Sequence, residues 1–381
     1  LKPFLLKANL NFGGWGEGPW RAAQQLGDGH SRAAMASCKS HGDVGELVAR
    51  VKACQCEGEL AAYRRNQWNQ FCTKYGDGVL DPQKHSASLL EQFLRTCGDA
   101  DGTEPCHDSA SARAELTKAG TEILNHIPAS WRPSYATPTR LTYDSVRYGF
   151  VDVVREMLDC PADVPLCKLH EVTRSPDFEP CPPLKKGMML AGMPFAERRE
   201  HKSKNRNKKD WVKSTVYCRF LELYKDFLRH EVLPALAADA GVKDLEAVVQ
   251  ATPVLRIVMP SSHFATQCHR DADYGHIPEE INYWLPLTPV WGSNSLYVES
   301  FPGHGDFSAF EGRDGDLFRW WGNQCSHYAK PNCTGSTRVS LDFRLIPRRF
   351  WDAAEAAGSL PDVACGPTRK HLGALRIGSY Y

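Results

Sequence analysis

The sequence lacks the features that would place it in several simple classes. It has no run of about 18 consecutive apolar residues, so no transmembrane helix is expected. Its 46 Lys and Arg residues nearly balance 45 Asp and Glu residues, and a formal net charge of +1 indicates neither a nucleic-acid coat nor a membrane-surface protein. Apolar residues make up 42% and charged residues 24% of the 381-residue chain, a composition that excludes a mostly disordered protein.

Cysteine is too sparse for a disulfide scaffold. The 14 Cys residues are irregularly spaced, and no CxxC pair occurs, so a structural zinc site is not expected. Reduced thiols in an intracellular protein, cytoplasmic or organellar, are the favoured interpretation, and a secreted protein with several disulfides is the alternative. The chain begins with Leu rather than Met, which indicates a fragment or a processed form.

The hydrophobic pattern predicts three parts of the chain. Residues 1–215 are helical and irregular, and we expect them to pack on the core. Residues 216–347 begin with an amphipathic helix at 216–239, which Pro234 kinks or divides, and continue as short β-like runs separated by Gly, Pro, Asn and Asp. Strands at this spacing predict a sandwich or barrel. Residues 348–381 are expected to form a short helix and a tail.

A basic segment precedes the amphipathic helix. Residues 197–213 contain eight Lys or Arg residues and three acidic ones, a local charge of +5. A solvated loop or exposed helix is the favoured interpretation, and an anchor for an anionic substrate, including nucleic-acid phosphate, is the alternative. Trp211 is the only aromatic residue in the segment, which weakens the nucleic-acid interpretation.

The residues that indicate chemistry begin with the motif His269-Arg270-Asp271. Residues two apart on an extended strand point to the same side, so this imidazole and this carboxylate can bind one ion. A metal needs a third ligand, and His327, 56 residues beyond Asp271, is the candidate. Two imidazoles and one carboxylate leave three octahedral positions open, as in the facial triad of non-haem Fe(II) oxygenases.

A candidate anion anchor follows the distal histidine. Arg338 and Ser340 alternate with Val339 on a predicted strand and therefore share a face. An Arg fork beside a hydroxyl is suited to a carboxylate, and an iron-bound 2-oxoglutarate needs a cation at its far carboxylate. The rival interpretation is that Arg338 pairs with a structural acid such as Asp342, and that another 2-oxo acid or ascorbate fills the open iron positions.

These motifs together resemble the Fe(II)/2-oxoglutarate-dependent oxygenases. Residues 252–347 are similar to the StrG-like group, in particular the stretches HRDADYGHIPEEINYWLPLTPVWGSNSLYVES and GNQCSHYAKPNCTGSTRVSLDFRLIP. The resemblance implies an α+β protein. Its core would be a double-stranded β-helix, the jelly-roll or cupin-like fold, with a mostly helical N-terminal region packed on it.

The resemblance also implies roles for particular residues. The iron ligands, which are also the catalytic residues, would be His269, Asp271 and His327. The contacts to 2-oxoglutarate would be Arg338 and Ser340, with Asn282 as a weaker one. The implied cofactors are Fe(II), 2-oxoglutarate and O₂, with ascorbate as a reductant, and the reaction would release succinate and CO₂.

Substrate contacts are predicted from position alone. Arg256 is a charge within an apolar strand, and it either extends to solvent at a sheet edge or points into the barrel. Asp273 and Tyr274 directly follow the second ligand, and Trp284 either lines the pocket or belongs to the core.

A polar small molecule is the favoured substrate, and hydroxylation is the favoured outcome. One alternative is the same chemistry on a nucleic-acid base or protein side chain, with residues 197–213 as the docking patch. Another alternative is a non-catalytic cupin-like binding module. No membrane partner is expected, and the oligomeric state is left open.

Overall fold

The computed structural model describes residues 5–9, 44–56, 68–97 apart from 70, 73–75 and 77, 109–173, 180–191, 211–261, 264–360, 377, 380 and 381. The chain divides into two compact units: residues 1–23 together with 108–381, and residues 24–107. Each unit is described by itself, and the predicted three-part division of the chain stays a prediction. No described helix is both long enough and apolar enough to cross a membrane.

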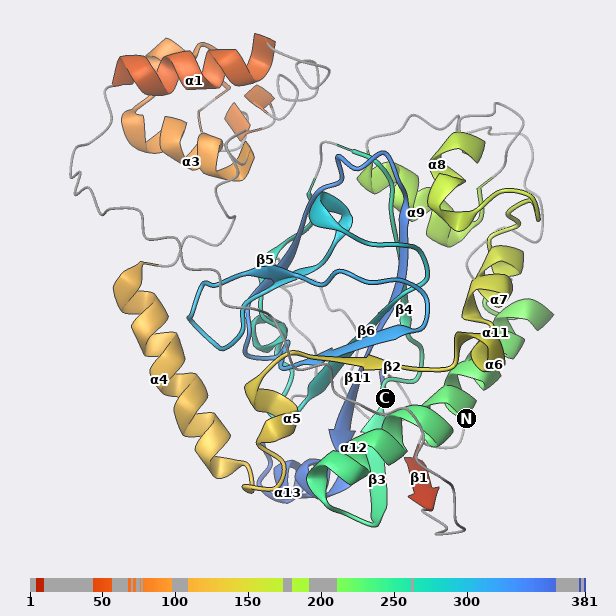
Figure 1. The fold of residues 1–381 in the computed structure, drawn as a ribbon. Coiled ribbons are helices and arrows are strands. Elements are labelled where there is room, and N and C mark those ends of the chain that lie inside the picture. The colour runs from red at the N-terminus through yellow and green to blue at the C-terminus, as the bar shows by residue number, and fades with distance from the viewer. Residues whose placement is uncertain are drawn as a thin grey trace, which may run out of the picture. The chain divides into compact units, whose positions relative to one another are not determined.

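The unit at residues 24–107 has a small apolar core of its own. Helices α1 (Val44–Cys56) and α3 (Ala87–Cys97) supply part of it, and a 3-10 helix (Pro82–Lys84) precedes α3 (Figure 1). Trp68 is almost fully buried, stacks edge-on against Phe93 at 4.6 Å, and donates its indole N–H to the carbonyl oxygen of Leu80 at 2.6 Å. These contacts join the segment before α3 to the helix itself.

Two antiparallel sheets form the core of the large unit. The larger sheet has the order β1-β3-β11-β6-β9-β2, with β4 also paired to β11. Its strands are β1 (Leu5–Asn9), β2 (Thr139–Thr142), β3 (Asp244–Val249), β4 (Val254–Val258), β6 (Ile281–Pro286), β9 (Asp316–Trp320) and β11 (Arg338–Pro347). The smaller sheet has the order β5-β10-β7-β8, with β5 (Phe264–His269), β7 (Tyr297–Val298), β8 (Ser308–Ala309) and β10 (His327–Pro331).

This arrangement is the predicted α+β fold with a double-stranded β-helix core. The N-terminal region also contributes strands that the sequence did not predict: β1 pairs with β3, and β2 pairs with β9, so both extend the large sheet. The other described elements of the large unit are α4 (Ala110–His126), α5 (Pro133–Ala136), α6 (Ser145–Tyr148), α7 (Phe150–Met157), a 3-10 helix (Leu166–Lys168), α8 (Leu169–Val172), α9 (Pro182–Leu190) and α13 (Arg348–Ala356).

The amphipathic helix predicted at 216–239 is divided in the structure. It consists of α11 (Thr215–Phe227), a π-helical turn (Leu228–Val232) and α12 (Leu233–Ala240). Pro234 lies in the first turn of α12, directly after the π-helical turn, and has no N–H to donate to that preceding turn. Gly241 follows α12 in the left-handed conformation, with φ of 66°, and ends the helix.

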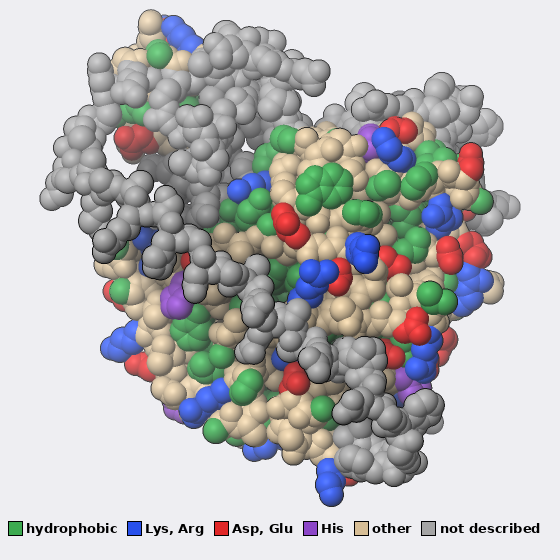
Figure 2. All heavy atoms as spheres, in the orientation of Figure 1, with side chains coloured by type: hydrophobic (Ala, Val, Ile, Leu, Met, Phe, Trp, Pro, Cys, Tyr) green, Lys and Arg blue, Asp and Glu red, His purple; other side chains and the backbone are tan. Residues whose placement is uncertain are grey.

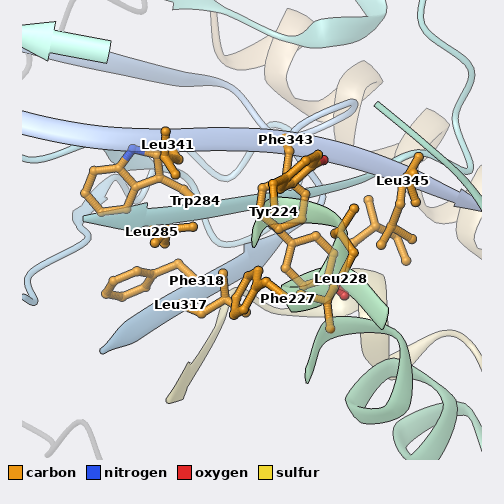
Figure 3. Packing of buried hydrophobic residues seen from close by; sticks show 14 of the residues in the cluster. Tyr224, Phe227, Leu228, Trp284, Leu285, Leu317, Phe318, Leu341, Phe343 and Leu345 are labelled. Carbon is orange, nitrogen blue, oxygen red and sulfur yellow. The ribbon is translucent and has the colours of Figure 1, made fainter. Parts of the chain in front are cut away.

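Strand β11 separates two chemical environments. It is buried along its whole length, and its side chains alternate between the two faces of the large sheet. On one face Phe343 packs edge-on against Tyr224 of α11, with ring centroids 5.3 Å apart, and Leu341 and Leu345 lie on either side of it (Figure 3). Phe343 stacks on Tyr283 of β6, with ring centroids 5.2 Å apart. The other face carries four polar residues, at positions 338, 340, 342 and 344, and it lines the pocket described below.

Charged side chains of both signs are interspersed over the described surface in the view of Figure 2, in keeping with the formal net charge of +1. Of the basic segment 197–213, only residues 211–213 belong to the described residues. There Trp211 donates its indole N–H to the carbonyl oxygen of Met157 at 3.2 Å. The docking role of the rest of the segment therefore stays a prediction.

Candidate metal centre

The three predicted metal ligands meet at one end of the small sheet. His269 ends β5 and His327 begins β10, and the antiparallel register pairs them directly. Asp271 opens a 3-10 helix (Asp271–Tyr274) immediately after β5. Its Oδ1 lies 3.8 Å from Nε2 of His269 and 3.9 Å from Nε2 of His327, and the three potential ligand atoms all lie within 4.8 Å of one another. The structure thus brings together the residues that the sequence singled out.

His327 is held in the form that binds a metal. Its Nδ1 lies 3.0 Å from the carbonyl oxygen of Cys325. Since a carbonyl can only accept a hydrogen bond, Nδ1 carries the proton, and Nε2 keeps its lone pair toward Asp271. Burial and the neighbouring His269 ring lower the pKa of His327 to about 4. The imidazole is therefore neutral at neutral pH, as metal ligation requires.

Asp271 is held as a carboxylate with one oxygen committed to protein donors. Burial alone would raise its pKa, but the charge of Arg344 and its hydrogen bond outweigh burial and hold the pKa well below its usual range. Its Oδ2 accepts from Asn282 Nδ2 at 2.6 Å and from Arg344 Nε at 2.7 Å. Asn282, predicted as a cosubstrate contact, thus lies beside a ligand, and its contact with a cosubstrate stays a prediction.

The absence of a side chain at Gly322 permits this arrangement. A Cβ there would lie 2.6 Å from Asn282 Cγ and 2.7 Å from Trp320 Nε1, closer than real Cβ contacts occur. The Gly322 carbonyl oxygen also accepts from the Asp271 backbone N–H at 3.0 Å. The loop after β9 therefore fixes the backbone of one ligand while leaving room for the amide that holds its side chain.

The metal ligands open into a pocket inside the β-helix. It contains about 360 Å³ of empty space, including the open solvent at its mouth. The residues that line it are Arg256, Thr266, His269, Trp284, Leu296, Trp320, His327, Arg338, Asp342 and Arg344. Both predicted ends of the site, the histidine ligands and Arg338, therefore face one pocket.

Arg338 is a buried cation whose donors are incompletely satisfied. It is 1% exposed, and its Nη1 donates to the main-chain oxygen of Asn294 at 2.9 Å. Its Nε has no hydrogen-bond partner within the described part of the chain, and neither does the fully buried Oγ of Ser340. Burial, together with the nearby Arg256, lowers the pKa of Arg338 to about 9. An anion would satisfy these donors and offset the cost of burying the charge.

The rival pairing of Arg338 with Asp342 is not observed. Asp342 is bound by both nitrogens of a different fork, because Arg256 Nε and Nη2 lie 2.6 and 3.0 Å from its two carboxylate oxygens. Arg256 sits on β4 directly opposite Ser340 of β11. Of the two orientations predicted for Arg256, the structure has the one that faces the pocket.

The remaining predicted substrate residues lie in two places. Asp273 pairs with Arg270, accepting from its backbone N–H at 3.0 Å and from Nη2 at 2.9 Å. Tyr274 stands edge-on to the His269 ring, with centroids 5.3 Å apart. Trp284 lines the pocket, and its ring centroid lies 5.8 Å from the guanidinium carbon of Arg338. Contact of these residues with a substrate stays a prediction.

Cysteine chemistry near the centre differs in part from expectation. Cys268, directly before His269, is disulfide-bonded, so the expectation of reduced thiols is wrong at this position. Cys325 and Cys333, on either side of His327, are free. An intracellular location stays a prediction.

The sequence analysis did not identify the residues behind Asp271. Arg344 donates to Asp271, Gln250 and Tyr380, and its Nε lies 3.4 Å from the fully buried Glu280. The sequence did contain one indication of this role, because Arg344 and Arg338 are an even number of residues apart on one strand and therefore share a face of β11. The contact with Tyr380 had no local signal.

Comparison with known proteins gives partial similarities. No protein-family model matches the sequence. The streptomycin biosynthesis protein StrG of Streptomyces griseus is 35% identical over 113 residues, which are 29% of this chain and 52% of StrG. The chain therefore spans about half the length of this curated relative. That coverage does not assign it to a StrG-like group.

The solved structures to which the chain is similar include three enzymes. A non-heme monooxygenase, ThoJ with Ni, has a TM-score of 0.28 at 16% identity, covering 39% of this chain and 63% of ThoJ. The non-heme alpha-ketoglutarate-dependent carbocyclase SnoK has a TM-score of 0.23 at 17% identity, covering 33% of this chain and 58% of SnoK. A prolyl hydroxylase from Trichoplax adhaerens has a TM-score of 0.27 at 9% identity, covering 65% of this chain and 97% of the hydroxylase. Similarity at this level does not assign an activity, which has to be inferred from the site itself.

Proposed function

We propose that this protein is an Fe(II)- and 2-oxoglutarate-dependent dioxygenase that hydroxylates a polar small molecule and releases succinate and CO₂. The observation that carries the proposal is one pocket with two chemically different ends. One end has two imidazoles and a carboxylate converging on one point, and the other has a buried arginine with unsatisfied donors. The partial similarity to StrG, a streptomycin biosynthesis protein, supports the small-molecule part of the proposal.

The donor set fits Fe(II). Neutral imidazole and carboxylate ligands suit non-haem iron, and three ligands leave positions for a cosubstrate and for O₂. When bound, Fe(II) would be chelated by the 2-oxo acid and would activate O₂ for oxidation of the substrate. His269, Asp271 and His327 would hold the metal, and His327 needs no proton loss to do so, because burial already keeps it neutral.

The opposite end fits the far carboxylate of 2-oxoglutarate. Arg338 would donate to it through Nε, which has no partner among the described residues, and Ser340 would donate through its hydroxyl. Trp284 was predicted as a substrate contact, but its position over the Arg338 guanidinium supports a role at the cosubstrate end, where its unpaired indole N–H supplies a further donor.

The substrate would approach from the side of His269 and Tyr274. His269 has the more exposed side chain of the two histidines, 16% against 6% for His327. Arg256, Asp273 and Tyr274 are the proposed contacts, and the limited pocket volume supports a small molecule. Ascorbate would serve as an external reductant.

The proposal is tested by anaerobic titration of the Fe(II) protein with 2-oxoglutarate. A chelated 2-oxo acid gives a visible metal-to-ligand charge-transfer band, which a non-catalytic module that does not bind 2-oxoglutarate at its metal would not show. A screen of polar small molecules for stimulated succinate release would then identify the substrate. Absence of the band in iron-loaded protein, or full turnover without a 2-oxo acid, would reject the proposal.

A further inference from the structure

We propose that Arg344, anchored by Tyr380, is a positioning residue that restricts Asp271 to binding the metal through one oxygen. The inference rests on the metal centre of the proposed function, but it does not depend on 2-oxoglutarate. Neither residue touches the point where the ligand atoms converge, so both would act through Asp271.

The two oxygens of Asp271 have different surroundings. Oδ1 faces the Nε2 atoms of the two histidines, at 3.8 and 3.9 Å. Oδ2 accepts from Asn282 and Arg344 at 2.6 and 2.7 Å, both short hydrogen bonds to a buried carboxylate. A carboxylate that loses these two donors is free to turn and to offer both oxygens to a metal.

Arg344 is itself held by residues from distant parts of the chain. Its Nη1 donates to Gln250 Oε1 at 3.3 Å and to the Tyr380 hydroxyl oxygen at 2.9 Å. The Gln250 backbone N–H in turn donates to the carbonyl oxygen of Arg344 at 2.9 Å. The guanidinium is thus fixed at both its Nε and its Nη1, which defines its plane and the direction of the bond to Asp271.

Tyr380 is also fixed at both its backbone and its ring. Its carbonyl oxygen accepts from the Ala251 backbone N–H at 2.9 Å, and its ring stands edge-on to His276 at 5.3 Å. Its neighbour Tyr381 is buried, packs against Trp351 at 5.2 Å, and donates its hydroxyl to Glu280, whereas the Tyr380 hydroxyl accepts from Arg344. Two adjacent tyrosines therefore reach the same layer but different partners.

The chemical consequence concerns the number of open metal positions. Two imidazole nitrogens and one carboxylate oxygen leave three of six octahedral positions open. A bidentate Asp271 would close one of them, and the proposed reaction uses all three. Residues that support a ligand in this way typically change metal affinity by about 10- to 100-fold when they are replaced.

Cobalt(II) alone is a suitable probe, because imidazole and carboxylate ligands accept it and its d–d absorption reports coordination number. We expect Arg344→Lys to weaken Co(II) binding by about 10- to 100-fold and Tyr380→Phe by about 3- to 10-fold. Both variants should also change the d–d spectrum. Tyr143→Phe is the matched control, because it removes the hydroxyl of another buried tyrosine, which donates to Asp314 at 2.9 Å. Its affinity and spectrum should stay close to those of the wild type.

The variants separate positioning from general loosening of the fold. If Arg344→Lys does not fold, Tyr380→Phe, which removes one oxygen from one side chain, still tests the inference. Equal losses in Tyr380→Phe and Tyr143→Phe would overturn it, as would an unchanged spectrum in a folded Arg344→Lys protein. If the Co(II) results hold and the 2-oxoglutarate band is absent, the proposed function fails while this inference stands.

Discussion

Two arginines on the same inward face of β11 differ in how fully their hydrogen-bond donors are satisfied. Arg344 lies at the metal end of the pocket, and its donors reach Asp271, Gln250 and Tyr380. Arg338 is more deeply buried, yet its one hydrogen bond within the described residues goes to the Asn294 carbonyl oxygen. Within the described residues, the arginine donors at the metal end of the pocket have protein partners, whereas Arg338 Nε at the other end has none.

This difference distinguishes an arginine that stabilises the native structure from one that is expected to bind a ligand. A buried charge is tolerated when it is paired and fully hydrogen-bonded, so the satisfied Arg344 network contributes to the native structure. A buried charge without a counterion is destabilising unless something else supplies the missing partner. The charged and unsatisfied end of a pocket is therefore the end where an anionic ligand is expected, whereas the satisfied end prepares a ligand for a cation.

The largest effect should come from breaking the metal end directly. We expect His327→Ala to abolish iron-dependent turnover and to weaken Fe(II) binding by more than about 100-fold, since a lost ligand matters more than a lost supporting contact. Fe(II) binding and turnover measure this. His126→Ala, on the exposed last turn of α4, is the control. Full turnover of His327→Ala with stoichiometric iron would refute the ligand assignment.

The second prediction compares the arginines through stability. Arg344→Met leaves Asp271 and Glu280 buried without their cation, and we expect it to lower the unfolding free energy of the metal-free protein by about 3–5 kcal/mol. Arg338→Met removes a charge that forms no ion pair within 4.0 Å among the described residues, so stability should be unchanged or higher. Urea unfolding followed by tryptophan fluorescence measures both. Equal destabilisation by the two substitutions would remove the distinction between the two ends.

The third prediction concerns ligand binding at the incomplete end. Arg338→Ala should weaken 2-oxoglutarate binding by about 2–5 kcal/mol, because a desolvated charge pair is lost, and Arg338→Lys should be intermediate, because it keeps the charge but not the fork. Fe(II) affinity should stay nearly unchanged in both. The apparent KM for 2-oxoglutarate measures the effect, and an unchanged KM in Arg338→Ala would contradict the anchor.

Local rules were enough to predict much of this site from the sequence. The alternation of side chains along a strand predicted that Arg338 and Ser340 share a face, and they do so on β11. The same rule predicted that His269 and Asp271 share a side; their ligand atoms do converge, but β5 ends at His269 and Asp271 opens a 3-10 helix, so the strand reason was wrong there. The short β-like runs after the amphipathic helix predicted a sandwich or barrel, and the resemblance to a known family narrowed this to a double-stranded β-helix. These inferences needed no knowledge of which strands pair.

The remaining features depend on pairing between distant segments. Strand β1 becomes a strand by pairing with β3, more than 200 residues away, within a region that has little periodicity of its own. Tyr380 reaches Arg344 only because its backbone is bound to Ala251. Whether Arg256 or Arg338 takes Asp342 is decided by the register of β4 against β11. None of these contacts follows from spacing.

The smallest expected effect comes from removing one hydroxyl group, that of Ser340. Ser340 and Ser134 are both buried, and neither Oγ has a hydrogen-bond partner among the residues that the structure describes, but only Ser340 lies on the inward face of β11. Removing an unsatisfied buried hydroxyl should leave the unfolding free energy of either variant unchanged or slightly higher. Ser340→Ala should also lose one hydrogen bond to 2-oxoglutarate, about 0.5–1.5 kcal/mol, which corresponds to roughly a 2- to 13-fold higher apparent KM. Ser134→Ala should leave that KM unchanged. If Ser340→Ala also leaves it unchanged, the anchor consists of Arg338 without the hydroxyl.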